Sequence, residues 1–144
     1  MPAMISFEPT EQEVRAVYAG IAAADPVQVG SRNFNPLQLV IRDERGTLIA
    51  GLDGGTAWTW LHVYALWVDA PFRRHGLGTR LMEAAEAEAR KRGCDHAMLS
   101  TFDFQARGFY ERCGYTVWGE LQGFPAGHSH LYLRKTLVHP SGEA

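Results

Sequence analysis

Arginine and glycine residues gather near the middle of the chain, where residues 73–79 read Arg-Arg-His-Gly-Leu-Gly-Thr. A glycine loop between a strand and a helix directs backbone N–H groups and the positive end of the helix dipole toward one anionic group. Glycines at 76 and 78 would let a diphosphate approach the main chain, because no Cβ stands in the way. The pattern predicts a phosphate-binding loop, although a plain strand-to-helix turn with solvated basic residues fits it too.

The segments around this loop have the periodicities of a strand, a helix and a second strand. An apolar run at residues 66–68 precedes the loop. The helix that follows has one apolar stripe, which consists of Leu77, Leu81, Met82, Ala85 and Ala89. Gly93 ends this helix, and a strand is expected at residues 96–101. A short helix within residues 104–115 and strands at 115–121 and 130–137 complete the second half.

Two motifs in this half resemble the GNAT superfamily of acyl-CoA-dependent N-acyltransferases. Arg73-x-x-Gly76-x-Gly78 is similar to the pyrophosphate loop of that family, and Ala106-x-x-Phe109-Tyr110-x-x-x-Gly114-Tyr115 is similar to its A-x-x-[LF]-Y-x-x-x-G-[FY] motif. The resemblance covers roughly residues 66–117. It implies an α/β (α+β) fold with a mixed, mostly antiparallel central sheet of six to seven strands and helices on both faces.

The first half of the chain carries compatible patterns. We expect a strand at 5–8, a helix at 10–24, a loop at 25–36, strands at 37–42 and 47–52, and a central strand at 58–68. Val14, Val17 and Ile21 are predicted to form the buried side of the first helix, and Gly54-Gly55 to form a turn. Along the central strand, one face is predicted to carry Trp58, Trp60, His62, Tyr64 and Leu66, and the other Thr59, Leu61, Val63, Ala65 and Trp67.

The resemblance implies that acetyl-CoA is bound as a co-substrate. The residues expected to contact it are the main chain of Leu66, Trp67 and Val68, the loop residues Arg73, Arg74, His75, Gly76, Leu77, Gly78 and Thr79, and the side chains of Gln105 and Tyr110. The N–H of Val68 or of Trp67 is expected to polarise the thioester carbonyl. Asp103 stands where relatives often have an asparagine that contacts the cofactor, so that contact is in question.

Acyl transfer also requires a proton donor for the leaving thiolate and a route for the proton of the amine. The resemblance makes Tyr110 the candidate general acid, although packing on an apolar helix face would equally explain a tyrosine there. The expected central strand has no carboxylate, so a base there would be His62 or Tyr64. Glu120 is another candidate, with His128 and His130 as further alternatives. A base acting through water, or no dedicated base, also fits the sequence.

Composition limits the class of protein. The chain has 144 residues, 46% hydrophobic and 21% charged, which is typical of a folded domain, and we expect one domain spanning residues 1–144. The net charge of −2 and the lack of a basic tract beyond the loop argue against binding to nucleic acid. Apolar runs fall far short of the ~20 residues of a membrane-spanning helix. No secretory signal is visible, so a cytoplasmic protein is expected.

Cysteine and histidine patterns point to no metal. Cys94 and Cys113 each lie beside a helix-ending glycine, which favours packing over a disulfide. His128-x-His130 has no third ligand at a suitable spacing, so we expect no metal site.

The resemblance, together with these observations, predicts an N-acetyltransferase that acts on a primary amine of a small molecule by direct attack within a ternary complex. A non-catalytic acyl-CoA-binding or sensor module is the alternative. An ATP or dinucleotide domain fits poorly, because the loop lacks both G-x-x-x-x-G-K-[ST] and a full G-x-G-x-x-G. A homodimer that pairs through the C-terminal strands also fits the sequence.

Overall fold

The structure is a computed structural model, and it describes residues 3–137. Its contacts divide the chain into two compact units, Met1–Arg32 and Asn33–Ala144. The single domain expected for residues 1–144 stays a prediction.

The N-terminal unit contains one α-helix, α1 (Glu11–Ala23). The helix begins with a capping box, in which the Glu13 N–H donates to Thr10 Oγ1 over 3.1 Å and the Thr10 N–H donates to Glu13 Oε1 over 2.9 Å. A 3₁₀ turn, η1 (Val27–Val29), follows it. The Arg32 guanidinium pairs with the Asp25 carboxylate at 2.7 Å. This ion pair joins the residues on either side of η1.

One expectation for this unit is wrong. Residues 5–8 form no strand, because no second segment of the unit pairs with them. The unit also buries no residue of α1. Nothing within this unit packs on Val14, Val17 and Ile21, so the buried side predicted for this helix stays a prediction.

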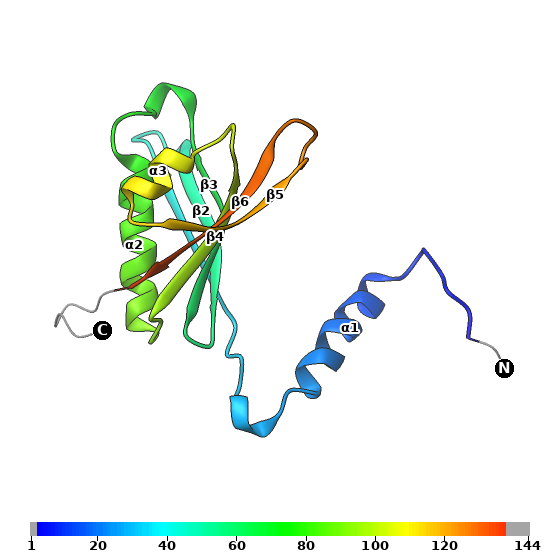
Figure 1. Ribbon diagram of the computed structural model, residues 1–144. Helices are drawn as coiled ribbons and strands as arrows, with labels where there is room; N and C mark the ends of the chain where they lie inside the picture. Colours follow the sequence, from blue (N-terminus) through cyan, green and yellow to red (C-terminus); the bar gives the residue numbers. More distant parts are fainter. Residues whose placement is uncertain (1–2, 138–144) are drawn as a thin grey trace. The chain divides into compact units, whose positions relative to one another are not determined.

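The second unit is built on one six-stranded sheet in the order β1-β2-β3-β4-β6-β5. Its strands are β1 (Asn35–Arg42), β2 (Leu48–Ala57), β3 (Trp60–Val68), β4 (His96–Phe102), β5 (Thr116–Gln122) and β6 (Ser129–Thr136). β3 and β4 pair in parallel, and every other pair of neighbours is antiparallel. The predicted mixed, mostly antiparallel sheet is therefore confirmed (Figure 1).

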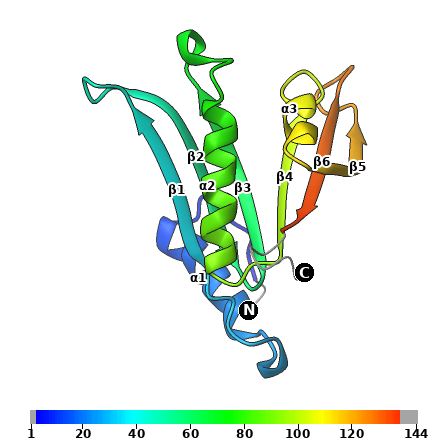
Figure 2. The ribbon, with the colours of Figure 1, turned by 90° about the vertical axis from the view of Figure 1, so that its left-hand side faces the viewer.

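Helix α2 (Leu77–Lys91) connects the two parallel strands. It lies across the half of the sheet formed by β1, β2 and β3 (Figure 2). A short turn, η2 (Ala70–Phe72), precedes it, and α3 (Arg107–Arg112) follows β4. The predicted apolar stripe of α2 faces the core, where the largest fully buried side chains are Leu37, Leu61, Met82, Leu99, Leu131, Leu133, Leu137 and Cys94. Both cysteines are free thiols.

Gly54 and Gly55 lie inside β2, so the turn predicted there is wrong. A Cβ at Gly54 would come within 2.6 Å of the His62 carbonyl oxygen, and one at Gly55 within 2.7 Å of the Phe34 ring. The two glycines allow close packing across the strand. The chain turns later, at Trp58, whose φ is 48°, and β3 accordingly begins at residue 60 and not at 58.

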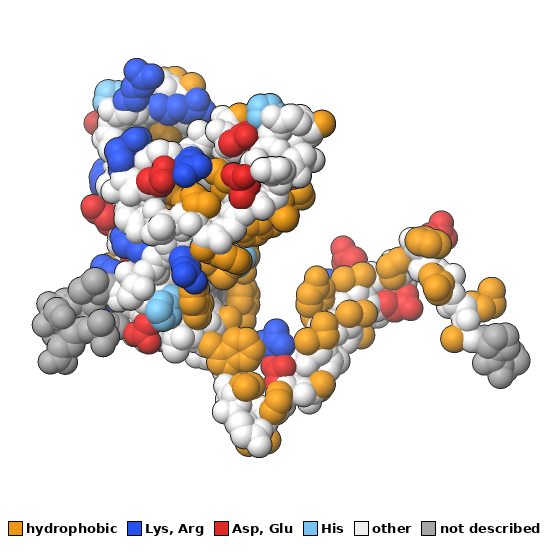
Figure 3. Space-filling model, viewed as in Figure 1, with side chains coloured by type: hydrophobic (Ala, Val, Ile, Leu, Met, Phe, Trp, Pro, Cys, Tyr) orange, Lys and Arg blue, Asp and Glu red, His pale blue; other side chains and the backbone are white. Residues whose placement is uncertain are grey.

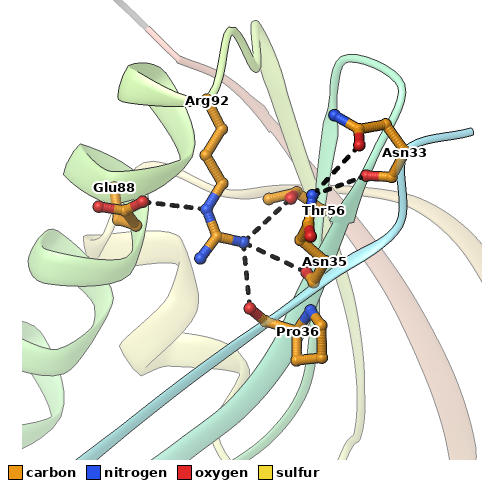
Figure 4. A network of polar contacts seen from close by, with 6 residues as sticks. All are labelled: Asn33, Asn35, Pro36, Thr56, Glu88 and Arg92. Atoms are coloured by element: carbon orange, nitrogen blue, oxygen red, sulfur yellow. Dashed lines mark hydrogen bonds and ion pairs between the residues drawn. The ribbon is translucent and has the colours of Figure 1, made fainter.

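The end of α2 is joined to the edge of the sheet through Arg92 (Figure 4). Its Nη1 donates to the carbonyl oxygens of Asn35 at 3.2 Å and Pro36 at 3.1 Å, and to Thr56 Oγ1 at 3.1 Å. Its Nε donates to Glu88 Oε2 at 2.9 Å. One guanidinium thus links the last turn of α2 to the start of β1 and the end of β2.

Candidate functional site

The parallel strands β3 and β4 separate partway along their length. They pair from Trp60 with His96 as far as Val63 with Leu99. Beyond that point β3 continues against β2 to Val68, while β4 continues against β6 to Phe102. Figure 2 shows the two strands diverging toward the end of the sheet where α2 begins.

The divergence opens a cleft of about 770 Å³. Its walls come from β3, from β4 with the segment before α3, and from β6. The lining residues are Val63, Tyr64, Ala65, Leu66, Trp67, Val68, Arg73, Leu99, Ser100, Thr101, Phe102, Phe104, Gln105, Ala106, Tyr110 and His130. The cleft therefore brings together residues 66–68, Arg73, Gln105 and Tyr110, all of which the sequence nominated.

A β-bulge at Tyr64 changes which side chains of β3 face the core. In the pairing of β2 with β3, Asp53 is opposite Ala65 while Gly54 is opposite Val63, so Tyr64 is an extra residue. Before the bulge, Leu61 and Val63 are buried; after it, Leu66 and Val68 pack against the core. The regular alternation predicted for residues 58–68 is therefore wrong beyond Val63.

The bulge and the ladder together decide which main-chain groups face the cleft. The Asp69 N–H donates to the Ile49 carbonyl oxygen at 2.8 Å, toward β2. Because successive residues of an antiparallel strand direct these groups to opposite edges, the N–H of Val68 faces the cleft and that of Trp67 faces β2. Of the two donors expected for the thioester carbonyl, the geometry favours Val68.

The loop before α2 offers unpaired backbone donors at one end of the cleft. The first intrahelical bond runs from the Arg80 N–H to the Gly76 carbonyl oxygen at 3.0 Å. The N–H groups of Leu77, Gly78 and Thr79 precede it, so they have no intrahelical partner, and no side chain caps the helix. In Figure 3, Lys and Arg side chains gather over this end of the second unit.

Three basic side chains flank these donors. Arg73, Arg74 and His75 are all exposed. Arg73 also touches the cleft wall, because its Nε donates to the Val68 carbonyl oxygen at 2.9 Å. The loop can hold an anion through backbone N–H groups, a helix dipole and guanidinium groups together.

The two loop glycines have different reasons to be glycine. Gly76 adopts φ = +81° with no atom within 4 Å of a Cβ position, so its backbone conformation is what requires glycine. A Cβ at Gly78 would lie 3.1 Å from the Phe109 ring. Gly78 thus allows α3 to pack on α2, and the explanation predicted for both glycines, approach of a diphosphate, is not needed for Gly78.

Tyr110 lies on α3 with 7% of its surface exposed, and it lines the cleft. Its ring meets those of Phe109 and Tyr115 edge to face. Burial, and secondarily the nearby Cys113, raises the pKa of its phenol to about 12. Tyr110 consequently keeps its proton throughout the neutral range, and both the catalytic and the packing explanation agree with its position.

Gln105 and Asp103 lie before α3 and have different partners. Gln105 Oε1 accepts hydrogen bonds from Thr101 Oγ1 and from the Phe102 N–H, both at 3.1 Å. Asp103 turns to the connection between β5 and β6, where Oδ2 accepts from the Ser129 N–H and Oδ1 lies 2.9 Å from His128 Nδ1. The carboxylate does not line the cleft. Asp103 therefore does not stand where it could contact a cofactor in the cleft.

His62 and Glu120, two of the candidate bases named from the sequence, lie outside the cleft. His62 is half-buried against the Tyr64 ring at 4.3 Å, and desolvation lowers the pKa of its imidazole. Glu120 is exposed on β5. Neither is a lining residue of the cleft. Tyr64 and His130, which the sequence offered as alternatives, are both lining residues.

Within the part of the chain that the structure describes, no three His, Cys, Asp or Glu side chains are arranged to hold a metal ion. No helix among the same residues is long and apolar enough to cross a membrane.

The chain is similar to known proteins in sequence and in fold. Residues 7–115 match the acetyltransferase (GNAT) family. The chain is 49% identical over 94 residues to the blasticidin-S acetyltransferase of Streptomyces morookaense, covering 64% of this chain and 69% of that protein. A solved acetyltransferase from Bacillus cereus ATCC 14579 has a TM-score of 0.81 and 28% identity, covering 93% of this chain and 98% of that one. An aminoglycoside 6′-N-acetyltransferase complexed with coenzyme A shares the fold, with a TM-score of 0.64 and 19% identity over 72% of this chain and 74% of that one.

Proposed function

Because this chain belongs to the GNAT family of acetyltransferases and is an acyltransferase, we propose that it moves the acetyl group of acetyl-CoA to the primary amine of a small molecule. The observation that carries the proposal is the cleft between β3 and β4, which opens beside the unpaired N–H groups at the start of α2. A thioester on a long arm that ends in a diphosphate matches this combination of shape and charge.

The loop would hold the diphosphate. Backbone N–H groups of residues 76–79 and the guanidinium groups of Arg73 and Arg74 are the donors. The main chain of Leu66, turned toward the cleft, would pair with an amide of the pantetheine arm as a neighbouring strand does, which leaves the Val68 N–H for the thioester. Gln105, held by Thr101 and Phe102, would limit the position of the arm on the opposite wall.

Transfer would then proceed by direct attack of the amine on the thioester carbonyl. The Val68 N–H would donate to the oxygen as negative charge develops on it. The C–N bond forms, the C–S bond breaks, and the Tyr110 hydroxyl donates a hydrogen bond to the leaving sulfur. Both reactants are held together, so the entropy of bringing them into contact is lost on binding and not in the chemical step.

A small acceptor is supported by the relative that is 49% identical over 94 residues, a blasticidin-S acetyltransferase. A cytoplasmic location and a homodimer belong to the same proposal. Light scattering of the purified protein would test the dimer.

Gly76→Glu tests the cofactor site. The new carboxylate would stand among the donors and repel a diphosphate, so acetyl-CoA affinity in isothermal titration should fall at least about a hundredfold, or ~3 kcal/mol. Gly46→Glu is the matched control, because Gly46 has φ = +83° and equally open surroundings in a different turn. Parental affinity in Gly76→Glu would refute the loop assignment.

Thiol release over a panel of small amines tests the reaction. Release with at least one amine, dependent on both substrates and lost in Gly76→Glu, is expected. Binding of acetyl-CoA without release on any amine would contradict a small-molecule acceptor.

A further inference from the structure

His130 is the lining residue of the cleft that β6 contributes. It belongs to β6 and lies across from Phe102, the last residue of β4. Its neighbour Leu131 is buried in the core, so the His130 side chain projects from the other face of the sheet. The residue also lies beyond residues 7–115, the segment that matches the family.

Aromatic rings hold the imidazole in place. Phe102 stacks on it at 4.4 Å with an interplanar angle of 18°, while Phe124 and Tyr132 lie at 4.9 and 4.8 Å. The Nδ1 atom is buried and has no hydrogen-bond partner. Because His130 lines the cleft, Nε2 is the ring nitrogen left to meet a ligand there, in the tautomer that carries its proton on Nδ1.

We propose that His130 is the general base of the transfer reaction, an assignment that rests on the proposed function. As the amine nitrogen bonds to the thioester carbon, its surplus proton passes to Nε2 of the neutral imidazole. The C–S electron pair leaves with sulfur, and the proton on His130 returns to solvent after the amide departs. The stacked Phe102 ring favours the transient imidazolium, since an aromatic face attracts a cation.

His128 and His62, the other two histidines considered as bases, contact other residues. His128 lies two residues away, but its Nδ1 is 2.9 Å from the Asp103 carboxylate. His62 rests on Tyr64 and does not line the cleft. Both supply imidazoles of the same chemistry at nearby positions, which makes them matched controls.

Other titratable or charged groups lie on the elements around His130. Among them are Asp103 beyond the end of β4, Glu120 on β5, His128 before β6, Tyr132 on β6, and Tyr64, Tyr110 and Arg73 in the cleft wall. Tyr110 keeps its proton below about pH 12. A pH profile must therefore be compared between variants.

The test replaces each histidine in turn in the full chain, using an amine that the parent acetylates. His130→Gln should lower kcat at least about a hundredfold, with unchanged acetyl-CoA affinity and thermal midpoint. His62→Gln and His128→Gln should stay within about threefold of the parent, a change of ~0.7 kcal/mol in barrier. The dependence of kcat/KM on pH should change in His130→Gln and stay parental in the two control variants.

Chemical rescue separates catalysis from packing. Added imidazole should restore part of the rate of His130→Ala, with saturation, and leave His128→Ala unaffected. Parental kcat in His130→Gln, or an unchanged pH profile, would overturn the assignment of the base alone. Failure of the parent to release thiol with any amine would overturn the proposed function, and the assignment with it.

Discussion

At the scale of single residues, the environment of Tyr110 limits what its hydroxyl can do. Its phenol has a pKa of about 12, whereas an ordinary thiol has a pKa near 8.5. Full transfer of the proton to a thiolate would be uphill by roughly 5 kcal/mol. The cleft therefore favours a hydrogen bond from Tyr110 to the leaving sulfur, and solvent can supply the proton later.

Removing that hydroxyl should slow the reaction without loosening the cofactor. We expect Tyr110→Phe to lower kcat about ten- to a hundredfold, since a hydrogen bond to a charged group contributes about 1.5–3 kcal/mol, and to leave acetyl-CoA affinity within about twofold. The shape of the pH profile from pH 6 to 9 should not change, because Tyr110 does not ionise there. Parental kcat would instead assign this tyrosine to packing alone.

At the scale of elements, one extra residue in β3 creates the geometry of the site. The bulge at Tyr64 moves Leu66 and Val68 onto the core and turns their main-chain groups to the open edge. Gly54, opposite the bulge, can approach the His62 carbonyl because it has no Cβ. The neighbouring elements are held by side chains, of which Arg92 is the clearest case.

Arg92→Ala should destabilise the protein through the junction of α2 with β1 and β2. Three acceptors, Asn35, Pro36 and Thr56, lose their donor. The free energy of unfolding in urea should fall by about 2 kcal/mol. Lys91→Ala, an adjacent exposed position, is the control and should change it by less than about 0.5 kcal/mol. Equal midpoints for the two variants would contradict the role given to the guanidinium.

At the scale of the whole second unit, a buried polar cluster joins the two sides of the cleft. Glu86 on α2 accepts from Lys135 Nζ on β6 at 2.7 Å and from the Tyr115 hydroxyl at 2.9 Å. Lys135 also donates to the Cys113 carbonyl oxygen after α3. The Glu86 side chain is 5% exposed. Because an unpaired buried carboxylate is costly, the cluster fixes α2 relative to β6.

The buried tyrosines make stability depend on alkaline pH. Desolvation raises the pKa of Tyr110 to about 12 and, together with Glu86, raises that of Tyr115 further. Above pH 10 the unfolded chain releases these protons while the folded chain retains them, so stability is full below pH 10 and falls as pH rises. Tyr110 alone should account for about 2–3 kcal/mol between pH 10 and 12.

Urea titrations at pH 9, 10 and 11 check this dependence. The unfolding free energy should decline with pH in the parent and less steeply in Tyr110→Phe. An identical slope in both proteins would contradict the effect assigned to burial of this phenol.

Local patterns in the sequence were enough for the fold class and for much of the candidate site. The stripe from Leu77 to Ala89 predicted α2, and the glycine loop predicted its start, because helix periodicity and backbone conformation are properties of neighbouring residues. The two motifs led to residues 66–79 and to Tyr110. The histidine that faces the cleft was not singled out, since His62, His128 and His130 look alike in a sequence.

Pairing between distant segments decided the rest. Gly54 and Gly55 resemble a turn until Phe34 and the His62 carbonyl are seen against them, and the face of each β3 residue depends on a register with β2 that no local pattern encodes. The sequence by itself therefore determined the helices, the loop and the family. Only the tertiary structure decided which main-chain groups and which imidazole meet in the cleft, because these follow from contacts between residues far apart in the chain.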